Sequence, residues 1–329
     1  MLPVIVIFAP TACGKTALAR EIFGKSSLSY FKGMGEVVSA DSQAVYKGLD
    51  IGTAKPSAEE REDIPHHCID IADPRVQFGV GEWLEEADRA CREIASHKKF
   101  PIVTGGSGFY IRSFLLGLPS TPESDPEIRR QIKERLAQKG AYALYQELKE
   151  CDLESAKKIR VHDSYRVCRA LEVFYSSGKA LSSYAVPDKL RSCYDFCIIV
   201  LTRSREDLYS RINARVDSMF DQGLCEEISG LYSQGIGSDA PGMKAIGYGE
   251  FFDPSLGIDP AKMDFSTIAK NSDCIRSLKE KIKMDSRRYA KRQYTFMRGI
   301  PNALSFDMED RKSIEQEILR FCRSRMESL

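Results

Sequence analysis

The stretch Ala9-Pro10-Thr11-Ala12-Cys13-Gly14-Lys15-Thr16 decides the fold. It comes close to the G-x-x-x-x-G-K-[ST] phosphate loop, although its first position is alanine. An apolar strand candidate, Pro3 to Phe8, precedes it, and an expected helix, Lys15 to Phe23, follows it. Backbone N–H groups and the start of such a helix form a nest for anions. Lys15 adds a positive charge, and the Thr16 hydroxyl can ligate Mg²⁺. We therefore expect residues 9–16 to bind a diphosphate or polyphosphate.

Apolar strands and helical patterns alternate on both sides of this loop. The other expected strands are Glu36 to Ala40, Cys68 to Ala72, Phe100 to Thr104 and Asp195 to Leu201. A helix is expected over Glu82 to His97. This alternation predicts an α/β fold, a parallel sheet flanked by helices like that of P-loop NTPases. Ligands bind at the carboxyl ends of such strands, which points to the loops after Phe8, Ala40 and Thr104.

A change of composition predicts a helical insertion in this core. Residues 117–125 have the proline, serine and threonine content of a linker, and residues 126–177 read as wholly helical. We expect the first part of the core at 1–118 and a helical insertion domain at 119–185. The second part, 186–329, would complete the core and carry basic C-terminal helices.

Composition excludes several classes of protein. The 329 residues contain 48 Lys plus Arg and 47 Asp plus Glu, a balance that argues against a broadly basic nucleic-acid coat protein. The longest apolar runs, Val4 to Pro10 and Phe196 to Leu201, are too short to span a bilayer. Ten cysteines without a C-x-x-C pair, and no export signal, favour reduced thiols. We expect a cytoplasmic protein with no membrane partner, and nothing demands more than a monomer.

The positive charge is unevenly distributed. Residues 270–298, beginning at Lys270, hold ten basic and three acidic residues, with apolar residues at helical spacing. Tyr294 and Phe296 lie among the basic residues, a pattern typical of phosphate contacts combined with base stacking. A second cluster, Glu154 to Arg169, has five basic and two acidic residues. The alternative interpretation is that each basic cluster is an ordinary helix face exposed to solvent.

Asp41 follows the second expected strand, in Ser39-Ala40-Asp41-Ser42-Gln43. A carboxylate beside the phosphate loop could hold a metal ion or act as a general base. The alternative is an aspartate that only caps a turn. Nucleotide kinases and NTPases usually have a strand that ends in a metal-binding aspartate, whereas the strand from Phe100 ends in Thr104-Gly105-Gly106.

Eight segments in fixed order carry a resemblance to a known family. Besides the phosphate loop they are Val38 to Tyr46, Asp50 to Pro56, His66 to Ile71, Val103 to Tyr110, Arg169 to Val173, Ala245 to Glu250 and Ala290 to Arg298. Together they resemble the tRNA dimethylallyltransferases, also called tRNA isopentenyltransferases. Ser39 to Ser42, Asp50 to Pro56 and Lys291 to Gln293 are the most particular.

The resemblance implies a reaction. The family transfers a dimethylallyl group from dimethylallyl diphosphate to N6 of the adenosine 3′-adjacent to the anticodon, in tRNAs that read codons beginning with U. Diphosphate leaves, and Mg²⁺ assists. By resemblance Asp41 is the general base, and Thr11 lies at the substrate end of the loop. Arg211 or Arg215 would complete the diphosphate clamp; at i and i+4 of a helix, both can face one site.

The resemblance also implies contacts to the tRNA anticodon stem-loop. The target base would leave the loop stack and enter a channel opposite the diphosphate. Ser107 lies where the family usually has threonine, and either hydroxyl can bond a nucleotide. The expected tRNA-contacting residues are Asp41, Ser42, Gln43, Ala44, Ser107, Arg129, Tyr165, Arg166, Arg169, Lys244, Gly247, Tyr248, Lys291, Arg292, Gln293 and Arg298. A small-molecule kinase and a noncatalytic RNA-binding or nucleotide-switch protein are the alternatives.

Overall fold

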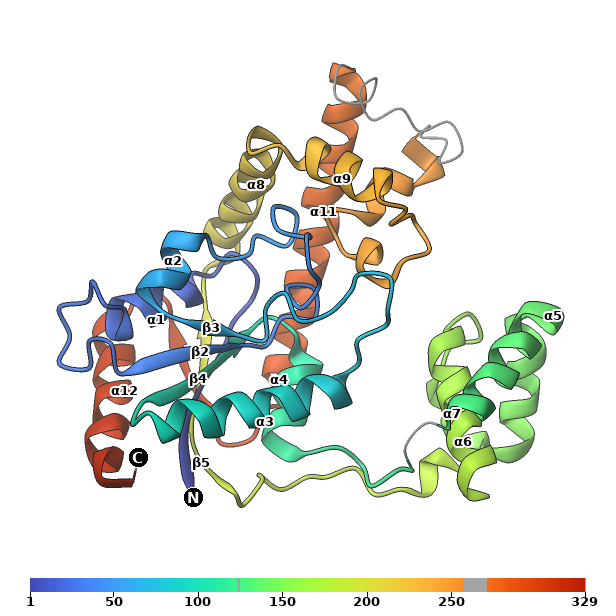
Figure 1. Cartoon of the computed structure of the whole chain (residues 1–329), viewed down its shortest axis with the longest axis horizontal. Coiled ribbons are helices and arrows are strands. Elements are labelled where there is room, and N and C mark those ends of the chain that lie inside the picture. The colour runs from blue at the N-terminus through green and yellow to red at the C-terminus, as the bar shows by residue number, and fades with distance from the viewer. Residues whose placement is uncertain (123–124, 257–270, 329) are drawn as a thin grey trace. The chain divides into compact units, whose positions relative to one another are not determined.

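The computed structural model describes residues 1–122, 125–256 and 271–328 (Figure 1). The chain divides into two compact units. The first comprises Met1–Leu115 together with Leu190–Leu329, and the second is Leu116–Lys189. Where the chain returns to the first unit, the backbone N–H of Arg191 donates to the carbonyl of Leu115 at 2.9 Å. The first unit is therefore built from two segments that meet at a backbone hydrogen bond.

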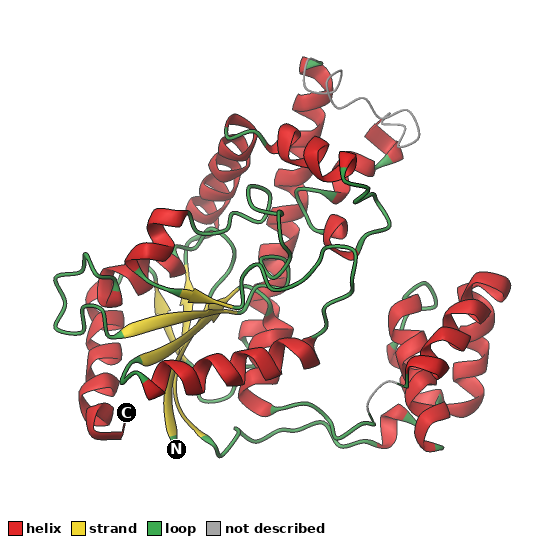
Figure 2. Cartoon of the chain, viewed as in Figure 1, coloured by secondary structure: helices red, strands yellow, loops and turns green. Residues whose placement is uncertain are grey.

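A six-stranded parallel sheet forms the centre of the first unit, in the order β3-β2-β4-β1-β5-β6. Figure 2 shows the strands in yellow, with helices around them. The α/β fold expected from the sequence is confirmed. Six of the seven residues of β1 are buried, as parallel strands covered on both faces require. The strands are β1 Leu2–Phe8, β2 Gly35–Ser39, β3 His66–His67, β4 Phe100–Gly105, β5 Tyr194–Thr202 and β6 Leu304–Asp307.

Helices cover both faces of this sheet (Figure 1). On one face, Leu18 of α1 and Ile314 of α12 join the core cluster that contains Ile5 and Ile7 of β1. On the other face, Trp83 of α3 stacks on Tyr110 of α4 with ring centroids 4.4 Å apart. The helices of this unit are α1 Lys15–Phe23, α2 Ala58–Asp63, α3 Val80–Ser96, α4 Gly108–Leu116, α8 Arg205–Asp221, α9 Leu224–Ser233, α11 Ser272–Met297 and α12 Arg311–Arg325. Short 3₁₀ turns are η2 Pro241–Lys244, η3 Gly249–Phe252, η4 Pro254–Leu256 and η6 Met326–Ser328.

Two strands differ from the expectation. The strand expected over Cys68 to Ala72 is wrong, because Cys68 and Asp70 have φ of 60° and 57° and leave the extended region; the strand is the preceding pair, His66–His67. The C-terminal segment was expected to be helical after Leu201, yet it contains β6. That strand pairs only with β5 and is mostly exposed, so it lacks the buried apolar run that marks the others.

The second unit consists of helices α5 Pro126–Cys151, α6 Leu153–Lys158 and α7 Ser164–Ser177, with the turn η1 Leu181–Ser183. Its own core includes Ile132, Leu148, Val167 and Leu171. Helix α5 is interrupted at Gly140, whose φ of 77° no helix accommodates. The helical character expected for residues 126–177 is observed. In the part of the chain that the structure describes, none of the helices has the length and apolarity needed to cross a membrane.

Candidate active site

The phosphate loop joins β1 to α1 and takes its shape from two residues with positive φ. These are Ala12, at 61°, and Gly14, at 103°, which caps the helix. A Cβ added to Gly14 would lie 3.2 Å from the Met308 side chain, so backbone conformation and space both favour glycine there. Ala9 lies outside this turn of positive φ and is fully buried. Alanine in place of the motif's first glycine therefore causes no backbone strain.

Side chains from distant elements bind the outward carbonyls of the loop. Arg211 Nε donates to the Ala12 carbonyl at 2.9 Å, and Arg203 Nε donates to the Cys13 carbonyl at 2.8 Å. Gln293 of α11 accepts from the Thr11 N–H at 3.0 Å and donates to the Gly106 carbonyl at 2.7 Å. These contacts fix the loop against α8, α11 and the β4–α4 connection.

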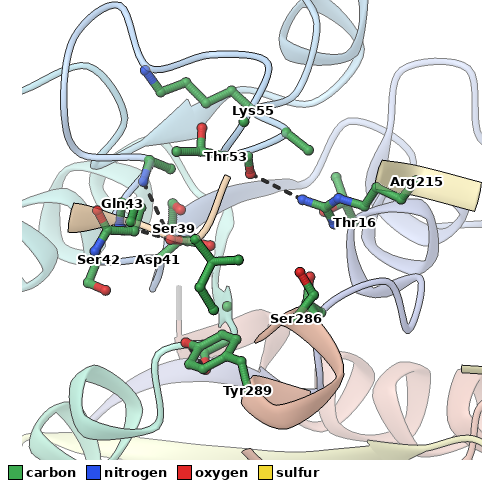
Figure 3. Close-up of a pocket in the computed structure, with 18 of the residues that line it drawn as sticks. Thr16, Ser39, Asp41, Ser42, Gln43, Thr53, Lys55, Arg215, Ser286 and Tyr289 are labelled. Carbon is green, nitrogen blue, oxygen red and sulfur yellow. Dashed lines mark hydrogen bonds between the residues drawn. The ribbon is translucent and has the colours of Figure 1, made fainter. Parts of the chain in front are cut away.

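A cavity of about 350 Å³ lies at the carboxyl ends of β1, β2 and β4. Figure 3 shows Asp41 and Arg215 on opposite sides of it, with Thr53 and Lys55 above and Tyr289 below. The residues expected from the sequence that line it are Thr11, Lys15, Thr16, Asp41, Ser42, Gln43, Ala44, Arg215, Lys244, Arg292 and Gln293. One cavity therefore combines the phosphate loop with the carboxylate.

A second hollow, called here the outer hollow, also borders the phosphate loop. It is lined by Ala12, Gly14, Lys15, Thr16 and both candidate arginines, Arg211 and Arg215. Lys15, Thr16 and Arg215 line both hollows, whereas Arg211 lines only the outer one. The two arginines therefore face the loop from different positions, and only Arg215 also faces Asp41 across the cavity.

Asp41 lies in a tight turn after β2. Its Oδ1 accepts the backbone N–H of Gln43 at 2.9 Å and that of Ala44 at 3.4 Å. The Ser107 hydroxyl accepts the Ser42 N–H at 2.8 Å and bonds the Ser42 hydroxyl at 3.1 Å. Asp41 is thus a turn cap and also lines the cavity, so the two interpretations of this residue are compatible. Ser107 holds the same turn.

Burial and charge make the cavity suited to an anion. Burial lowers the pKa of Lys15, and the neighbouring Arg215 lowers it further, although Asp41 opposes this. Burial also lowers the pKa of Arg215. Burial, helped by Asp41, raises the pKa of Tyr289 to about 12, so its hydroxyl stays protonated. Two desolvated cations and one carboxylate at the same cavity leave an excess of positive charge that a diphosphate would neutralise.

Comparison with known proteins identifies the family. A family model described as IPP transferase matches residues 44–300. A tRNA dimethylallyltransferase of Bacillus anthracis is 38% identical over 325 residues, which cover 98% of this chain and 96% of the relative. The chain belongs to the tRNA dimethylallyltransferase family. The resemblance inferred from the sequence motifs is confirmed.

Solved structures of this family share the fold. The tRNA isopentenylpyrophosphate transferase of Bacillus halodurans is 33% identical, with a TM-score of 0.64 over 100% of this chain and 98% of that one. A eukaryotic dimethylallyltransferase acting on tRNA is 26% identical, with a TM-score of 0.72 over 99% of this chain and 78% of that one. The fold of this chain is therefore shared with solved structures of the family over nearly its whole length.

Apart from residues 41–44 and Ser107, the residues that the family resemblance assigns to tRNA in the first unit fall into two groups. Lys244, Lys291, Arg292 and Arg298 are exposed. In contrast, Gly247, Tyr248 and Gln293 are buried. Tyr248 is 0% exposed and Gln293 2%, and the side chains of both bind backbone groups. Lys270 lies outside the described residues. Contact with tRNA stays a prediction for all of them.

In the second unit, the expected tRNA-contacting residues lie at the start of α5 and on α7. Arg129, Tyr165 and Arg166 are at least half exposed. Arg169 is more enclosed: it donates to the Pro122 carbonyl at 3.0 Å and lies 3.4 Å from Glu172. Glu172 also lies 3.5 Å from Arg129, so one buried carboxylate orders two arginines.

Two residues that lie at the cavity or support it, Lys55 and Glu227, were not assigned from the sequence. Lys55 is 1% exposed at its side chain, and its Nζ bonds the Tyr46 carbonyl, Asp50 and Asp70 at 2.5 to 2.7 Å. It belongs to the Asp50 to Pro56 motif, which was the available signal. No motif marks Glu227, whose carboxylate accepts three backbone N–H groups from the same segment.

Proposed function

We propose that this protein transfers the dimethylallyl group of dimethylallyl diphosphate to N6 of the adenosine 3′-adjacent to the anticodon, in tRNAs that read codons beginning with U. The observation that carries the proposal is the single cavity in which the phosphate loop and Asp41 face each other. Membership of the family gives the reaction class, and this cavity offers a place for both reacting groups.

The diphosphate is held by the loop N–H groups, Lys15, Thr16 and Arg215, with Arg211 at the outer side. Negative charge accumulates on the diphosphate as its bond to the prenyl carbon breaks. These donors are preorganised by the Arg203, Arg211 and Gln293 contacts, so they stabilise that charge without reorganising. Thr11 lies at the inner end of the loop, toward the reacting carbon.

The donor set of the cavity fits Mg²⁺ that is held mainly by the diphosphate. Among the described residues there is no group of three or more His, Cys, Asp or Glu side chains able to hold a metal ion. Mg²⁺ commonly takes one or two protein oxygens, substrate phosphates and waters. The Thr16 hydroxyl would be its protein ligand. When bound, the ion neutralises charge on the leaving group.

Asp41 acts as the general base. The N6 amine of adenine is a weak nucleophile, and its proton must leave as the C–N bond forms. Both hydrogen bonds from the turn go to Oδ1 of Asp41, which orients Oδ2 for the amine. A base of this kind contributes roughly 10²- to 10⁴-fold.

Transfer RNA is bound by exposed cations of both units. In the first unit these are Lys244, Lys291, Arg292 and Arg298, with the exposed Phe296 available for stacking. Ser42, Gln43, Ala44 and Ser107 form the turn that the target nucleotide would meet. The second unit adds Arg129, Tyr165, Arg166 and Arg169 for the anticodon stem. All ten cysteines are free, which suits a reducing cytoplasm, and we propose that the protein acts there as a monomer.

The direct test is incubation of the purified protein with labelled dimethylallyl diphosphate, Mg²⁺ and unmodified tRNA, followed by digestion to nucleosides. We expect N6-dimethylallyladenosine at the position 3′ to the anticodon. Mutating that adenosine to guanosine should remove the product. Label transfer to a small molecule in the absence of tRNA, or no transfer at all, would contradict the proposal.

A further inference from the structure

The segment Asp50 to Pro56, above the cavity in Figure 3, is held by one carboxylate. Glu227 of α9 accepts from the N–H of Asp50 at 3.0 Å and of Ile51 at 2.7 Å through Oε2. Its Oε1 accepts from the N–H of Gly52 at 3.3 Å and from the Tyr248 hydroxyl at 2.5 Å. Four donors converge on this carboxylate, and hydrogen bonds to a charged acceptor are the stronger ones.

Tyr248 locks the same segment from a second side. Its side chain is fully buried, and its hydroxyl also accepts the Gly52 N–H at 3.1 Å. A Cβ on Gly52 would come within 2.4 Å of the tyrosine ring, so the backbone passes directly against it. The segment therefore cannot shift without breaking contacts to both Glu227 and Tyr248.

The residue that follows Gly52 connects this arrangement to the cavity. The Thr53 carbonyl accepts a hydrogen bond from Arg215 Nη2 at 3.1 Å, which Figure 3 shows. A guanidinium presents five donors in a rigid plane, so fixing one donor orients the remaining ones. Arg215 lines both hollows beside the phosphate loop. Its orientation is therefore determined by where the Thr53 carbonyl lies.

From these contacts we infer that Glu227 is a positioning residue: through residues 50–53 and the Thr53 carbonyl, it sets Arg215 for binding the diphosphate. Glu227 itself does not line the cavity, so its effect on the diphosphate must pass through the segment that it holds. The inference rests on the proposed function, because it assigns Arg215 to the diphosphate of the prenyl donor.

The test compares Glu227→Gln with a matched control. The variant keeps the size of the side chain, but its NH₂ group faces N–H donors and cannot accept from them. Glu226→Gln removes an equal charge from the same first turn of α9, at an exposed side chain. Affinity for inorganic diphosphate with Mg²⁺ is measured by calorimetry on the whole chain. We expect about tenfold weaker binding for Glu227→Gln, as for a lost hydrogen bond to a charged group, and no change for Glu226→Gln.

A double-mutant cycle separates positioning from a general loss of stability. In an Arg215→Gln background, Glu227→Gln should change diphosphate affinity by less than about twofold, because the group it positions is already absent. In steady-state assays, Glu227→Gln should raise KM for dimethylallyl diphosphate while KM for tRNA stays within about twofold. Additive losses in the cycle would overturn the inference.

Tyr248→Phe gives an independent variant should Glu227→Gln fail to fold. It removes one donor to Glu227 and keeps the ring against Gly52, and we expect a smaller loss of diphosphate affinity in the same direction, about threefold. Unchanged affinity in every variant that folds would overturn the inference alone. Failure of the unaltered protein to bind diphosphate would instead contradict the proposed function, and the inference with it.

Discussion

Asp41 shows how a single carboxylate serves both fold and proposed reaction. Its Oδ1 closes the turn after β2, with the Gln43 N–H at 2.9 Å, while the side chain faces the cavity. Asparagine has nearly the same shape and keeps an oxygen for the turn, but it cannot accept a proton from the amine. The residue therefore allows a substitution that separates chemistry from structure.

We expect Asp41→Asn to lower the single-turnover rate of prenyl transfer by roughly 10²- to 10⁴-fold, the usual contribution of a general base. Affinities for tRNA and for Mg²⁺-diphosphate should stay within about threefold, since neither cationic surface changes. The rate is measured by label transfer and the affinities by filter binding and calorimetry. A rate near that of the unaltered protein would exclude the general-base role.

His66 makes stability depend on pH. Its Nδ1 lies 2.7 Å from the Ile64 carbonyl, and burial lowers its pKa from 6.5 to about 4. The unfolded chain binds this proton below pH 6.5 and the folded chain only near pH 4, so stability falls on acidification across that window.

Between pH 7 and pH 4.5 the free energy of unfolding of the unaltered protein should fall, in part because His66 becomes protonated on unfolding. In His66→Gln this fall should be about 2 kcal/mol smaller, a figure already reduced for the partial exposure of the ring. Urea unfolding at both pH values measures the difference. His97→Gln, at the end of α3, is the control, and equal pH dependence in all three proteins would contradict the assignment to His66.

Basic residues in the middle of helix α11 bind partners within the protein, whereas those at and just beyond its C-terminal end are exposed. Arg287 donates to Asn213 at 2.6 Å, and Lys283 and Arg288 form ion pairs with Asp217 and Asp285. Beyond them, Lys291, Arg292 and Arg298 are exposed. A cation that already forms an ion pair or hydrogen bond within the protein should contribute less to binding a phosphate than a cation exposed to solvent.

Charge reversal of Lys291, Arg292 and Arg298 together should weaken tRNA binding at least tenfold and flatten its salt dependence by roughly 0.7 to 0.9 in log–log slope per lost phosphate contact. Reversal of Arg288 alone, paired with Asp285, should have a much smaller effect per charge. Filter binding over a salt series measures both, and an unchanged slope in the triple variant would show that this end does not meet phosphate.

The sequence predicts a structural element well when the residues that determine the element are contiguous. The phosphate loop and α1 are read directly because strand, turn and helix are contiguous. No strand forms over Cys68 to Ala72, because Cys68 and Asp70 have positive φ. Positive φ is hard to predict from sequence at residues other than glycine. β6 was missed because it is a short, mostly exposed edge strand.

The candidate site follows the same rule. Asp41 was identified because it ends a strand beside the phosphate loop. Arg211 and Arg215 could not be told apart, because helical spacing brings both near the loop and only side-chain paths separate them. Glu227 was missed because its partners lie about 175 residues earlier in the chain, a separation that no local pattern reports.

For the whole molecule, we expect the two units to divide the binding of the two substrates. Every residue of the cavity belongs to the first unit, while Arg129, Tyr165, Arg166 and Arg169 belong to the second. The phosphate loop and its supporting contacts therefore do not depend on the helices of the second unit.

Replacing residues 117–189 by a short Gly-Ser linker should leave Mg²⁺-diphosphate affinity within about threefold and lower tRNA affinity at least tenfold, because the phosphate contacts of the helices are lost. Calorimetry and filter binding on the shortened protein measure the two effects, with circular dichroism as the check on folding. Undiminished tRNA affinity would show that the first unit alone provides the binding surface.

The hydrogen bond between Arg191 and Leu115 has a consequence for how this chain can vary. It closes the first unit at the point where the chain departs and returns, and the Arg191 side chain is secured by Asp88 at 2.5 Å. We therefore expect changes of length between residues 116 and 189 to leave the strand register of the sheet unchanged. We expect this enclosed segment to tolerate sequence change independently of the sheet, so that the proposed tRNA surface can vary while the proposed diphosphate site is kept.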